Sequence, residues 1–188
     1  MGEYVRTLSK SNIWGVDLLI FVTLGTQDKS FKRLLKLIDE LKHDKKIRDR
    51  IVVQAGYTKY ESDNMEIHDF ISQEKMKEYI KDAAIVITHG VVGSILDALK
   101  QNKKVIAAAR LKQYNEHTND HQLQIIREFR NRGYILALDN FSDIDEVLEE
   151  AKTFKPEPYK SNNIKFNNMI EKIIEEDDHT HWLRRKKK

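Results

Sequence analysis

The sequence predicts an α/β domain built on a single parallel, doubly wound sheet. Strand-like runs of apolar residues alternate with segments whose apolar residues recur at helical spacing, and this alternation is typical of parallel sheets. Several of the runs are apolar without interruption, as in strands that are covered on both faces. The length of 188 residues is enough for one such domain with short extensions.

The first half of the chain contains three strand-like and two helix-like segments. The opening run LLIFVTL is apolar throughout and stops at a polar turn that begins with Gly25. Beyond this turn, apolar residues from Phe31 to Leu41 recur at a spacing of three or four, which indicates an amphipathic helix. A second apolar run is closed by Gly56. Strands are predicted at residues 18–24, 51–55 and 65–70, and helices at residues 31–41 and 74–80.

The second half repeats this order and contains a stronger turn signal. The run AAIVIT leads into residues 89–94, where Gly93 and Ser94 are expected to open a helix. Ser142 is expected to cap the helix after the last strand. Strands are predicted at residues 83–88, 104–109 and 134–138, and helices at residues 94–100, 121–131 and from Ser142 onward. After Pro156 and Pro158, a last helix carries Phe166, Met169, Ile170, Ile173 and Ile174 on one side.

Composition excludes several classes of protein. With 40% hydrophobic and 34% charged residues, the chain is typical of a soluble globular domain. It has no cysteine, so disulfides and thiolate metal sites are excluded, and a reducing cytosol is expected. The five basic residues 184–188 carry +5 of a net charge of +3 and leave −2 on the rest, so the body offers no basic surface for nucleic acid. No apolar run approaches the roughly 20 residues that span a bilayer.

Two loops are candidates for ligand binding, because ligands of such sheets bind beyond the carboxyl ends of the strands. Gly25, Thr26 and Gln27 follow the first strand, and residues 89–94 follow the fourth. A helix that opens at Gly93 and Ser94 directs free backbone N–H groups and its positive dipole end toward a phosphate. The same residues are equally consistent with a tight turn in which glycine only permits the geometry.

Taken together, these motifs resemble the glycosyltransferase family 28 C-terminal domain. The resemblance rests on residues 20–27, on Phe70 with Ile71, and on residues 88–99 and 119–122, which occur in the family's order and cover residues 20–138. The likeness is nearest to stand-alone bacterial exopolysaccharide and capsule subunits, and the eukaryotic two-subunit enzyme that adds the second GlcNAc to a dolichol-linked sugar is similar. It implies a Rossmann-like domain that forms the C-terminal half of a GT-B fold.

The resemblance also implies a role for each site residue. Gly25, Thr26 and Gln27 are expected to border the pyrophosphate of a UDP-sugar. Phosphate binding is expected from the helix start, and Asp97, one turn along that helix, is expected to accept hydrogen bonds from the ribose. The remaining expected contacts are Phe70 and Ile71 around the uracil, His89, Gly93 and Ser94 at the phosphates, and Asp120, His121 and Gln122 at the donor sugar.

Val91 departs from the family's pattern, which has a second glycine at that place. If the position requires a positive φ or a close approach to phosphate, a β-branched residue there is costly. Weakened donor binding is then expected. This leaves a non-catalytic, stimulatory or structural subunit as the alternative function.

The function predicted from the resemblance is transfer of a hexose, preferably galactose or glucose, from a UDP-sugar to a lipid-linked acceptor in polysaccharide biosynthesis. A membrane-anchored partner subunit is expected to supply the acceptor site and the general base, which places the chain in the cytoplasm at the inner membrane face. No cofactor and no metal are expected, and the UDP-sugar is the donor substrate. Residues 1–17 are interpreted as an extension, 18–155 as the nucleotide-sugar domain and 156–188 as a C-terminal helix with a basic tail.

Three weaker patterns point to other functions. His117 and His121 have a spacing seen in zinc sites, but no HExxH motif accompanies them and Asn119 and Asp120 favour a loop. Asp139 and Asp143 resemble an acid–base pair, yet they flank a strand end and a helix start, where they favour the helix dipole. The terminal basic run could bind anionic lipid or nucleic acid, or it is a solvated chain end.

Overall fold

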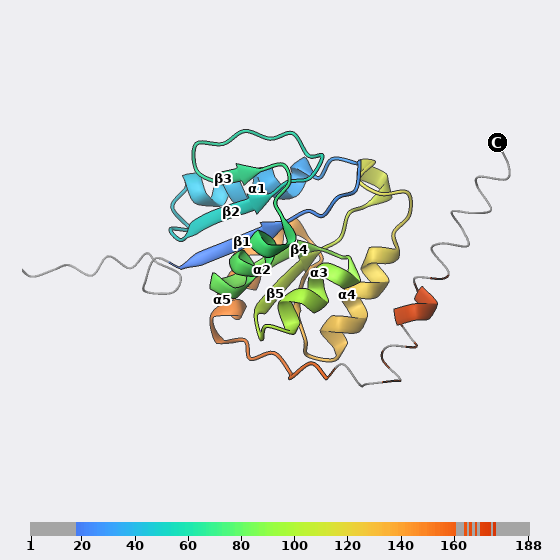
Figure 1. Ribbon diagram of the computed structural model, residues 1–188. Coiled ribbons are helices and arrows are strands. Elements are labelled where there is room, and N and C mark those ends of the chain that lie inside the picture. The colour runs from blue at the N-terminus through green and yellow to red at the C-terminus, as the bar shows by residue number, and fades with distance from the viewer. Residues whose placement is uncertain are drawn as a thin grey trace, which may run out of the picture.

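The computed structural model describes residues 18–160, 164, 166, 168, 170–173 and 175. They form a six-stranded sheet with the order β3-β2-β1-β4-β5-β6, in which every pair of neighbours is parallel (Figure 1). The predicted parallel α/β sheet is therefore confirmed. The strands are β1 (Leu19–Thr23), β2 (Arg50–Gln54), β3 (Glu66–His68), β4 (Ala83–His89), β5 (Lys104–Ala108) and β6 (Leu136–Leu138).

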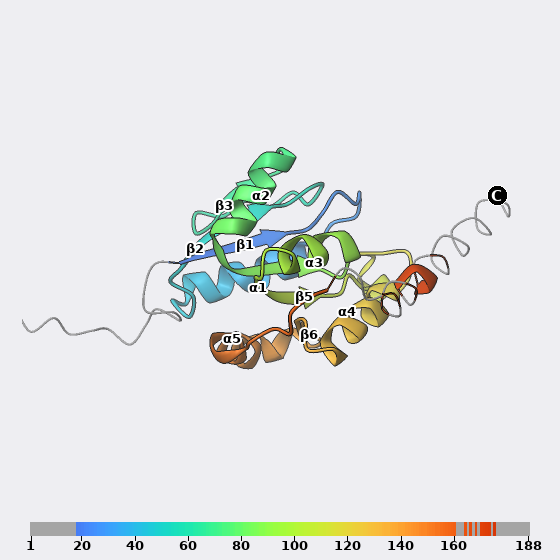
Figure 2. The ribbon, with the colours of Figure 1, turned by 60° about the horizontal axis from the view of Figure 1, so that its bottom comes forward.

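Helices cover both faces of the sheet. One face is covered by α1 and α5, which contribute Leu34 and Val147 to its apolar cluster. The other is covered by α2, α3 and α4, with Ile80, Ile95 and Phe129. Figure 2 shows α2 and α3 on the side of the sheet opposite α1 and α5. The helices are α1 (Lys32–His43), α2 (Gln73–Asp82), α3 (Val92–Leu99), α4 (His121–Asn131) and α5 (Ile144–Thr153), with short 3₁₀ helices at Lys112–Tyr114 (η1) and Phe141–Asp143 (η2).

The central strands explain why the apolar runs are continuous. In β1, Ile20 and Val22 belong to the cluster under α1 and α5, whereas Phe21 between them belongs to the cluster under α2, α3 and α4. All three side chains are fully buried. Both faces of the strand therefore demand apolar residues, as expected for a parallel sheet covered on two sides.

The connection between β2 and β3 contains no helix. Residues 55–65, which we call the crossover segment, return along α1 to the start of β3. Asp39 of α1 holds this segment, because its carboxylate accepts hydrogen bonds from Tyr60 Oη (2.9 Å), Ser62 Oγ (2.7 Å) and Asn64 Nδ2 (2.8 Å). One carboxylate thus fixes three residues of the crossover segment to α1.

Two predicted helix starts are wrong. Ser142 does not cap α5, because the chain first tightens into η2, where Ser142 Oγ donates to Asp143 Oδ1 (2.9 Å). The N-cap of α5 is Asp143, without a side-chain cap bond. Helix α3 begins at Val92, ahead of the predicted opening at Gly93 and Ser94, because the extended Val91 is its N-cap.

The described residues between 164 and 175 are helical, and we call them the C-terminal helix. Phe166 and Ile170 are buried on the α4 face of the domain. The Phe166 ring lies 4.9 Å from that of Phe129 and 5.6 Å from that of Tyr134, between ring centroids. These two residues therefore pack against the domain's own flank. Met169, Ile174, residues 1–17 and the basic run 184–188 lie outside the described residues.

None of the helices in the described ranges is both long and apolar enough to cross a membrane.

Candidate functional site

The candidate site lies where the chain reverses its direction of progress across the sheet. From β1 the chain moves outward to β2 and β3, and it then returns to β4 on the other side of β1. The carboxyl ends of these central strands are in register, with Thr23 beside Thr88 and His89 beside Ala108. The loops after β1, β4 and β5 therefore converge at one edge, which is the usual ligand position of such folds.

Gly25 and His89 form the contact between the first two of these loops. Gly25 has a φ of +70°, and a Cβ atom on it would lie 2.5 Å from Cε1 of His89. Only glycine fits there, because the conformation and the imidazole both exclude a side chain. Burial, reinforced by the charge of Arg110, lowers the pKa of His89 to about 3. Its imidazole is therefore neutral and packs beneath the loop, so it offers a phosphate no positive charge.

Gln122, in the first turn of α4, links the other two loops. Its Oε1 accepts hydrogen bonds from the backbone N–H of Gly90 (3.2 Å) and of Arg110 (3.0 Å). Two donors on one oxygen fix the orientation of the amide. Gly90 approaches so closely that a Cβ atom on it would lie 2.7 Å from Cβ of Gln122.

The amide nitrogen of Gln122 has no acceptor among the described residues. Gln122 is only 3% exposed and its Nε2 is buried without a hydrogen-bond partner. A buried donor left unpaired costs about 1–3 kcal/mol, so native proteins rarely keep one without a reason. The site thus contains a rigidly oriented donor group that an oxygen atom of a ligand would satisfy.

The start of α3 is uncapped. Val91 is its N-cap residue and supplies no side-chain acceptor, and no acidic residue lies in the first turn. No described side chain is hydrogen-bonded to the N–H groups of Val92, Gly93 or Ser94, and a Cβ atom on Gly93 would meet nothing within 4 Å. Free N–H groups and open space at the positive end of a helix dipole suit an anion such as phosphate.

Val91 itself is not strained. Its φ of −98° and ψ of 129° are ordinary for a β-branched residue, so the expected penalty of a positive φ does not exist. Its side chain is 39% exposed. Any effect of Val91 on donor binding must then come from the space that its side chain fills at the start of α3.

Two exposed aromatic residues lie after β2 and β3. Phe70 is 51% exposed and stands edge-to-face with Tyr57, which is 54% exposed, with 5.2 Å between ring centroids. Ile71 is half-buried against the apolar cluster of α2 and α3. The sequence prediction did not include Tyr57, although its position directly after the Gly56 turn was a usable signal.

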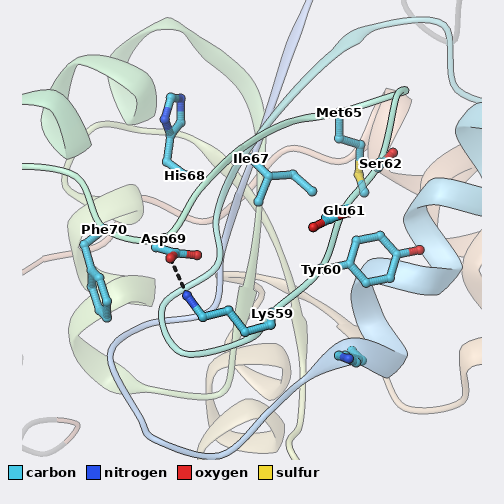
Figure 3. Close-up of a pocket in the computed structure, with 10 residues that line it drawn as sticks. Lys59, Tyr60, Glu61, Ser62, Met65, Ile67, His68, Asp69 and Phe70 are labelled. Carbon is cyan, nitrogen blue, oxygen red and sulfur yellow. Dashed lines mark hydrogen bonds and ion pairs between the residues drawn. The ribbon is translucent and has the colours of Figure 1, made fainter.

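A hollow of about 1130 Å³ lies under the crossover segment (Figure 3). Lys59 and Asp69 form an ion pair at its wall, and Phe70 stands at its margin. Phe70 is the one predicted site residue in this lining, so the hollow and the strand-end site are different places. Its lining residues are Lys32, Lys59, Tyr60, Glu61, Ser62, Met65, Ile67, His68, Asp69 and Phe70.

Other predicted residues are not joined to the Gly25, His89 and Gln122 cluster by any contact of the described chain. Asp120 closes its own loop, since Oδ1 accepts from the backbone N–H of Lys112 (2.9 Å). His121 Nδ1 lies 3.2 Å from Gln124 Oε1 on the same helix. Asp97 on α3 and Thr26 are exposed, while Gln27 and Ser94 are half-buried.

An arginine that the sequence prediction omitted lies beneath the β1–α1 loop. Arg110, directly after β5, donates to the carbonyls of Leu24 (2.8 Å) and Lys29 (2.6 Å) and stacks on Phe31 at 4.9 Å. Burial lowers the pKa of Arg110 to about 10, which leaves it charged at neutral pH. A lone arginine at the end of an apolar strand was the available signal.

An ion pair that the sequence prediction also omitted fixes the loop between β5 and α4. Arg33 of α1 donates to both carboxylate oxygens of Glu116, from Nε at 2.9 Å and from Nη2 at 2.8 Å. Its guanidinium also lies 3.7 Å from the ring centroid of Phe141 and 4.5 Å from that of Tyr114. Bidentate, stacked pairs of this kind are rigid, so the loop that leads to Gln122 is anchored from α1.

Comparison with known proteins identifies the family. Residues 19–176 match the glycosyltransferase family 28 C-terminal domain. The chain belongs to this family. Among curated proteins, a relative of this family 28 domain is the UDP-N-acetylglucosamine transferase subunit ALG13 of Eremothecium gossypii. The two are 39% identical over 85 residues, which are 44% of this chain and 38% of that protein. The match thus covers well under half of that relative's length.

Solved structures agree with the fold. The glycotransferase of kitacinnamycin has a TM-score of 0.58 and 17% identity, and the match covers 81% of this chain and 39% of that one. The solution structure of ALG13 has a TM-score of 0.51 and 20% identity, with 81% and 94% covered. These likenesses establish the fold, which is the Rossmann-like C-terminal half of a GT-B glycosyltransferase.

Proposed function

We propose that this family 28 domain binds the UDP-sugar donor of a split GT-B hexosyltransferase and transfers sugar only together with a partner subunit. The observation that carries the proposal is Gln122, whose amide is fixed by two backbone donors while its Nε2 has no acceptor among the described residues. The uncapped start of α3 follows the same loop. A sugar diphosphate would supply oxygen acceptors to both.

The proposed chemistry uses the donor half for electrostatic stabilisation. When the glycosidic bond to UDP breaks, negative charge grows on the leaving diphosphate, and in this proposal the N–H groups of Val92, Gly93 and Ser94 at the uncapped start of α3 stabilise it. His89 is neutral and so would act by packing rather than by charge. The general base for the acceptor hydroxyl belongs, in this proposal, to the partner.

The identity of the transferred sugar is a more specific part of the proposal. The likeness to exopolysaccharide subunits favours galactose or glucose, whereas the fungal relative is named as a UDP-N-acetylglucosamine transferase subunit. A panel of UDP-galactose, UDP-glucose and UDP-GlcNAc, compared by calorimetry under identical conditions, ranks the three. We propose a lipid-linked saccharide as acceptor and a membrane-anchored acceptor-domain subunit as partner, with the chain at the cytoplasmic face.

The Gln122→Glu substitution tests donor binding at this site. A glutamate has the same shape and keeps an oxygen for the N–H groups of Gly90 and Arg110, but it replaces the unpaired amide nitrogen with a second, anionic oxygen. We expect the affinity for the UDP-sugar to fall by about ten- to hundredfold, the range for a lost and repelled charged contact. Calorimetry with the UDP-sugar measures the loss, and urea unfolding checks that the fold persists.

Unchanged affinity for the UDP-sugar in the folded Gln122→Glu variant would contradict the proposed site. Asp97→Ala is the companion variant. It should weaken UDP more than free uracil, because the ribose contact proposed for Asp97 is absent from uracil. An equal loss for both ligands makes Asp97 a structural residue instead.

Dependence on a partner is tested by reconstitution. The purified chain with saturating UDP-sugar and a lipid-linked acceptor should show no transfer above background, and addition of the acceptor-domain subunit should restore it. The reason is that a GT-B active site lies between two domains, of which the described chain forms one. Full transfer by the chain alone would overturn the split-enzyme proposal.

The second candidate function, a non-catalytic subunit with weakened donor binding, rested on strain at Val91. The positive φ is absent, and the other condition, a close approach of Val91 to phosphate, is tested by Val91→Gly. Saturable UDP binding by the isolated chain separates the two functions, since only the donor-binding function requires it.

A further inference from the structure

Arg110 bridges both ends of the β1–α1 loop. Its Nη2 donates to the carbonyl of Leu24 (2.8 Å), directly before Gly25, and its Nη1 donates to the carbonyl of Lys29 (2.6 Å). The two terminal nitrogens of one guanidinium therefore hold the residues on either side of residues 25–28. The same loop is joined to the β5–α4 loop by Lys29, whose Nζ donates to Asn115 Oδ1 (2.7 Å).

The position of the guanidinium is fixed from the other side as well. Its planar group stacks on Phe31 at 4.9 Å. The backbone N–H of Arg110 donates to Oε1 of Gln122, the oxygen that also holds Gly90. Arg110 is thus the one residue in the described structure whose hydrogen bonds reach both the β1–α1 loop and Gln122.

The charge of Arg110 is incompletely matched. The residue is 1% exposed, yet no carboxylate of the described chain lies within ion-pair distance of its guanidinium, and its Nε has no hydrogen-bond partner. Glu116 and Asp28 act on it only through space. A buried cation bonded to carbonyl groups alone is costly, and an anion at the neighbouring loop would offset that cost.

We infer that Arg110 is a positioning residue for the donor diphosphate: it holds the Gly25–Asp28 loop in the shape that the diphosphate binds and places a buried positive charge beneath it. This inference rests on the proposed function for the identity of the ligand. The part of the inference that concerns the shape of the loop does not depend on the proposed function, because the hydrogen bonds of Arg110 define that shape. A purely structural arginine would stabilise the fold without any preference for a diphosphate ligand.

Two substitutions separate shape from charge. Arg110→Lys keeps the charge, but a single ammonium group cannot bridge two carbonyls as a guanidinium fork does. Arg110→Met keeps much of the length and removes the charge. We expect amide hydrogen exchange at residues 25–29 to rise by about tenfold or more in both variants, because a local opening that loses a charge-assisted hydrogen bond becomes easier by about that factor.

Ligand binding is measured with UDP and with uridine, by calorimetry. We expect the affinity for UDP to fall by about tenfold in Arg110→Lys and by more in Arg110→Met, whereas the affinity for uridine changes by less than about twofold, because uridine lacks the diphosphate. Urea unfolding confirms that each variant is folded before binding is compared. Arg110→Lys remains informative if Arg110→Met does not fold.

Arg132→Lys is the matched control. Arg132 also stacks on an aromatic ring, that of Phe166 at 4.9 Å, and its Nε also lacks a partner among the described residues, but it is part of the α4 flank. This variant should leave loop exchange and UDP affinity unchanged. Unchanged loop exchange in Arg110→Lys, or equal losses for UDP and uridine, would overturn the inference. Absence of UDP binding in the wild-type chain would instead contradict the proposed function, while loop exchange would still decide whether Arg110 positions the loop.

Discussion

At the scale of single residues, the site is defined by groups that lack a partner. Gln122 Nε2 and Arg110 Nε are buried donors without acceptors in the described chain, and Val91 leaves the first turn of α3 without a cap. A single substitution could remove either unpaired donor or supply the missing cap. Their coexistence at one edge of the sheet is what a site for an oxygen-rich anion requires.

The uncapped helix start gives a prediction in which stability and binding oppose each other. In Val91→Ser the hydroxyl can accept from the N–H of Gly93 or Ser94, so the free energy of unfolding should rise by about 0.5–2 kcal/mol. The same bond occupies a group that we assign to phosphate, so UDP affinity should fall several-fold. Urea unfolding and calorimetry measure the two quantities.

Val91→Gly is the control for the extra space, because it opens the loop without adding an acceptor. Its UDP affinity should equal or exceed that of the wild type. If Val91→Ser became more stable and still bound UDP as the wild type does, the phosphate would have to bind elsewhere.

At the scale of elements, the sequence predicts well what depends on local pattern. The apolar runs placed β1 and β4 correctly because a strand buried on both faces is mostly apolar, and the buried polar residues Thr23, Thr88 and His89 lie only at the carboxyl ends of these strands. Gly25 was recognisable because a turn follows such a run. The starts of α3 and α5 were missed because Val91 and η2 use backbone conformations that residue types do not specify.

The tertiary contacts of the site could not be predicted in the same way. Arg110 is bonded to Leu24, which lies 86 positions earlier, and Gln122 holds Gly90, 32 positions earlier. Only the order of strands in the sheet brings these residues together. The family resemblance suggested Gln122, but the reason for its orientation is visible only once β4, β5 and α4 are packed.

The crossover segment gives a prediction about pH. Burial raises the pKa of Asp39, but hydrogen bonds from Asn64, Ser62 and Tyr60 outweigh it, so the pKa is lowered from 3.8. The stability that Asp39 contributes is therefore complete above the unfolded-state value and is lost as the pH falls through the folded-state pKa. The difference in unfolding free energy between wild type and Asp39→Asn should be constant from pH 7 to 5 and shrink below about pH 4.

Urea unfolding at pH 7, 5 and 3.5 measures this difference. Glu40→Gln is the control, because Glu40 is exposed on the same helix and pairs only with Lys36 at 3.7 Å. Its effect should stay within about 0.5 kcal/mol at every pH. A difference for Asp39→Asn that grows as the pH falls would show that the carboxylate destabilises the folded chain.

The C-terminal helix gives a prediction with its own control. Phe166 is 1% exposed and packs among aromatic rings of the domain, so Phe166→Ala should lower the free energy of unfolding by about 3–5 kcal/mol. Ile164 on the same helix is 71% exposed, and Ile164→Ala should change it by less than about 0.5 kcal/mol.

Urea unfolding again measures both variants. Similar small losses for the two would mean that the helix contributes little to the isolated domain. Polar substitution at Ile170, which is 5% exposed, should likewise destabilise the domain itself, and any loss of partner binding would follow from that.

At the scale of the whole molecule, ligand binding should appear as added stability. UDP at about a hundred times its dissociation constant should raise the free energy of unfolding by about 2.7 kcal/mol, since it binds only the folded state. For a domain of this size, that corresponds to a rise of about 5–10 °C in Tm. Thermal unfolding with and without UDP measures the shift. With the UDP-sugar in place of UDP, the shift should be much smaller in Gln122→Glu, and an equal shift would place the sugar away from Gln122.

The order of the strands also has a consequence for how the chain is made. Ile20 of β1 pairs with Ile51 of β2 on one side and with Ile85 of β4 on the other. During synthesis at roughly 5–20 residues per second, the ribosome needs about 3–13 s to travel from Ile20 to Ile85. For that interval the most apolar strand of the nascent chain has one edge without its native neighbour, and an open apolar edge favours pairing with other chains. Slower growth of the host, which slows synthesis, would lengthen this exposure, whereas early binding of a chaperone to residues 18–24 would protect the strand until β4 emerges.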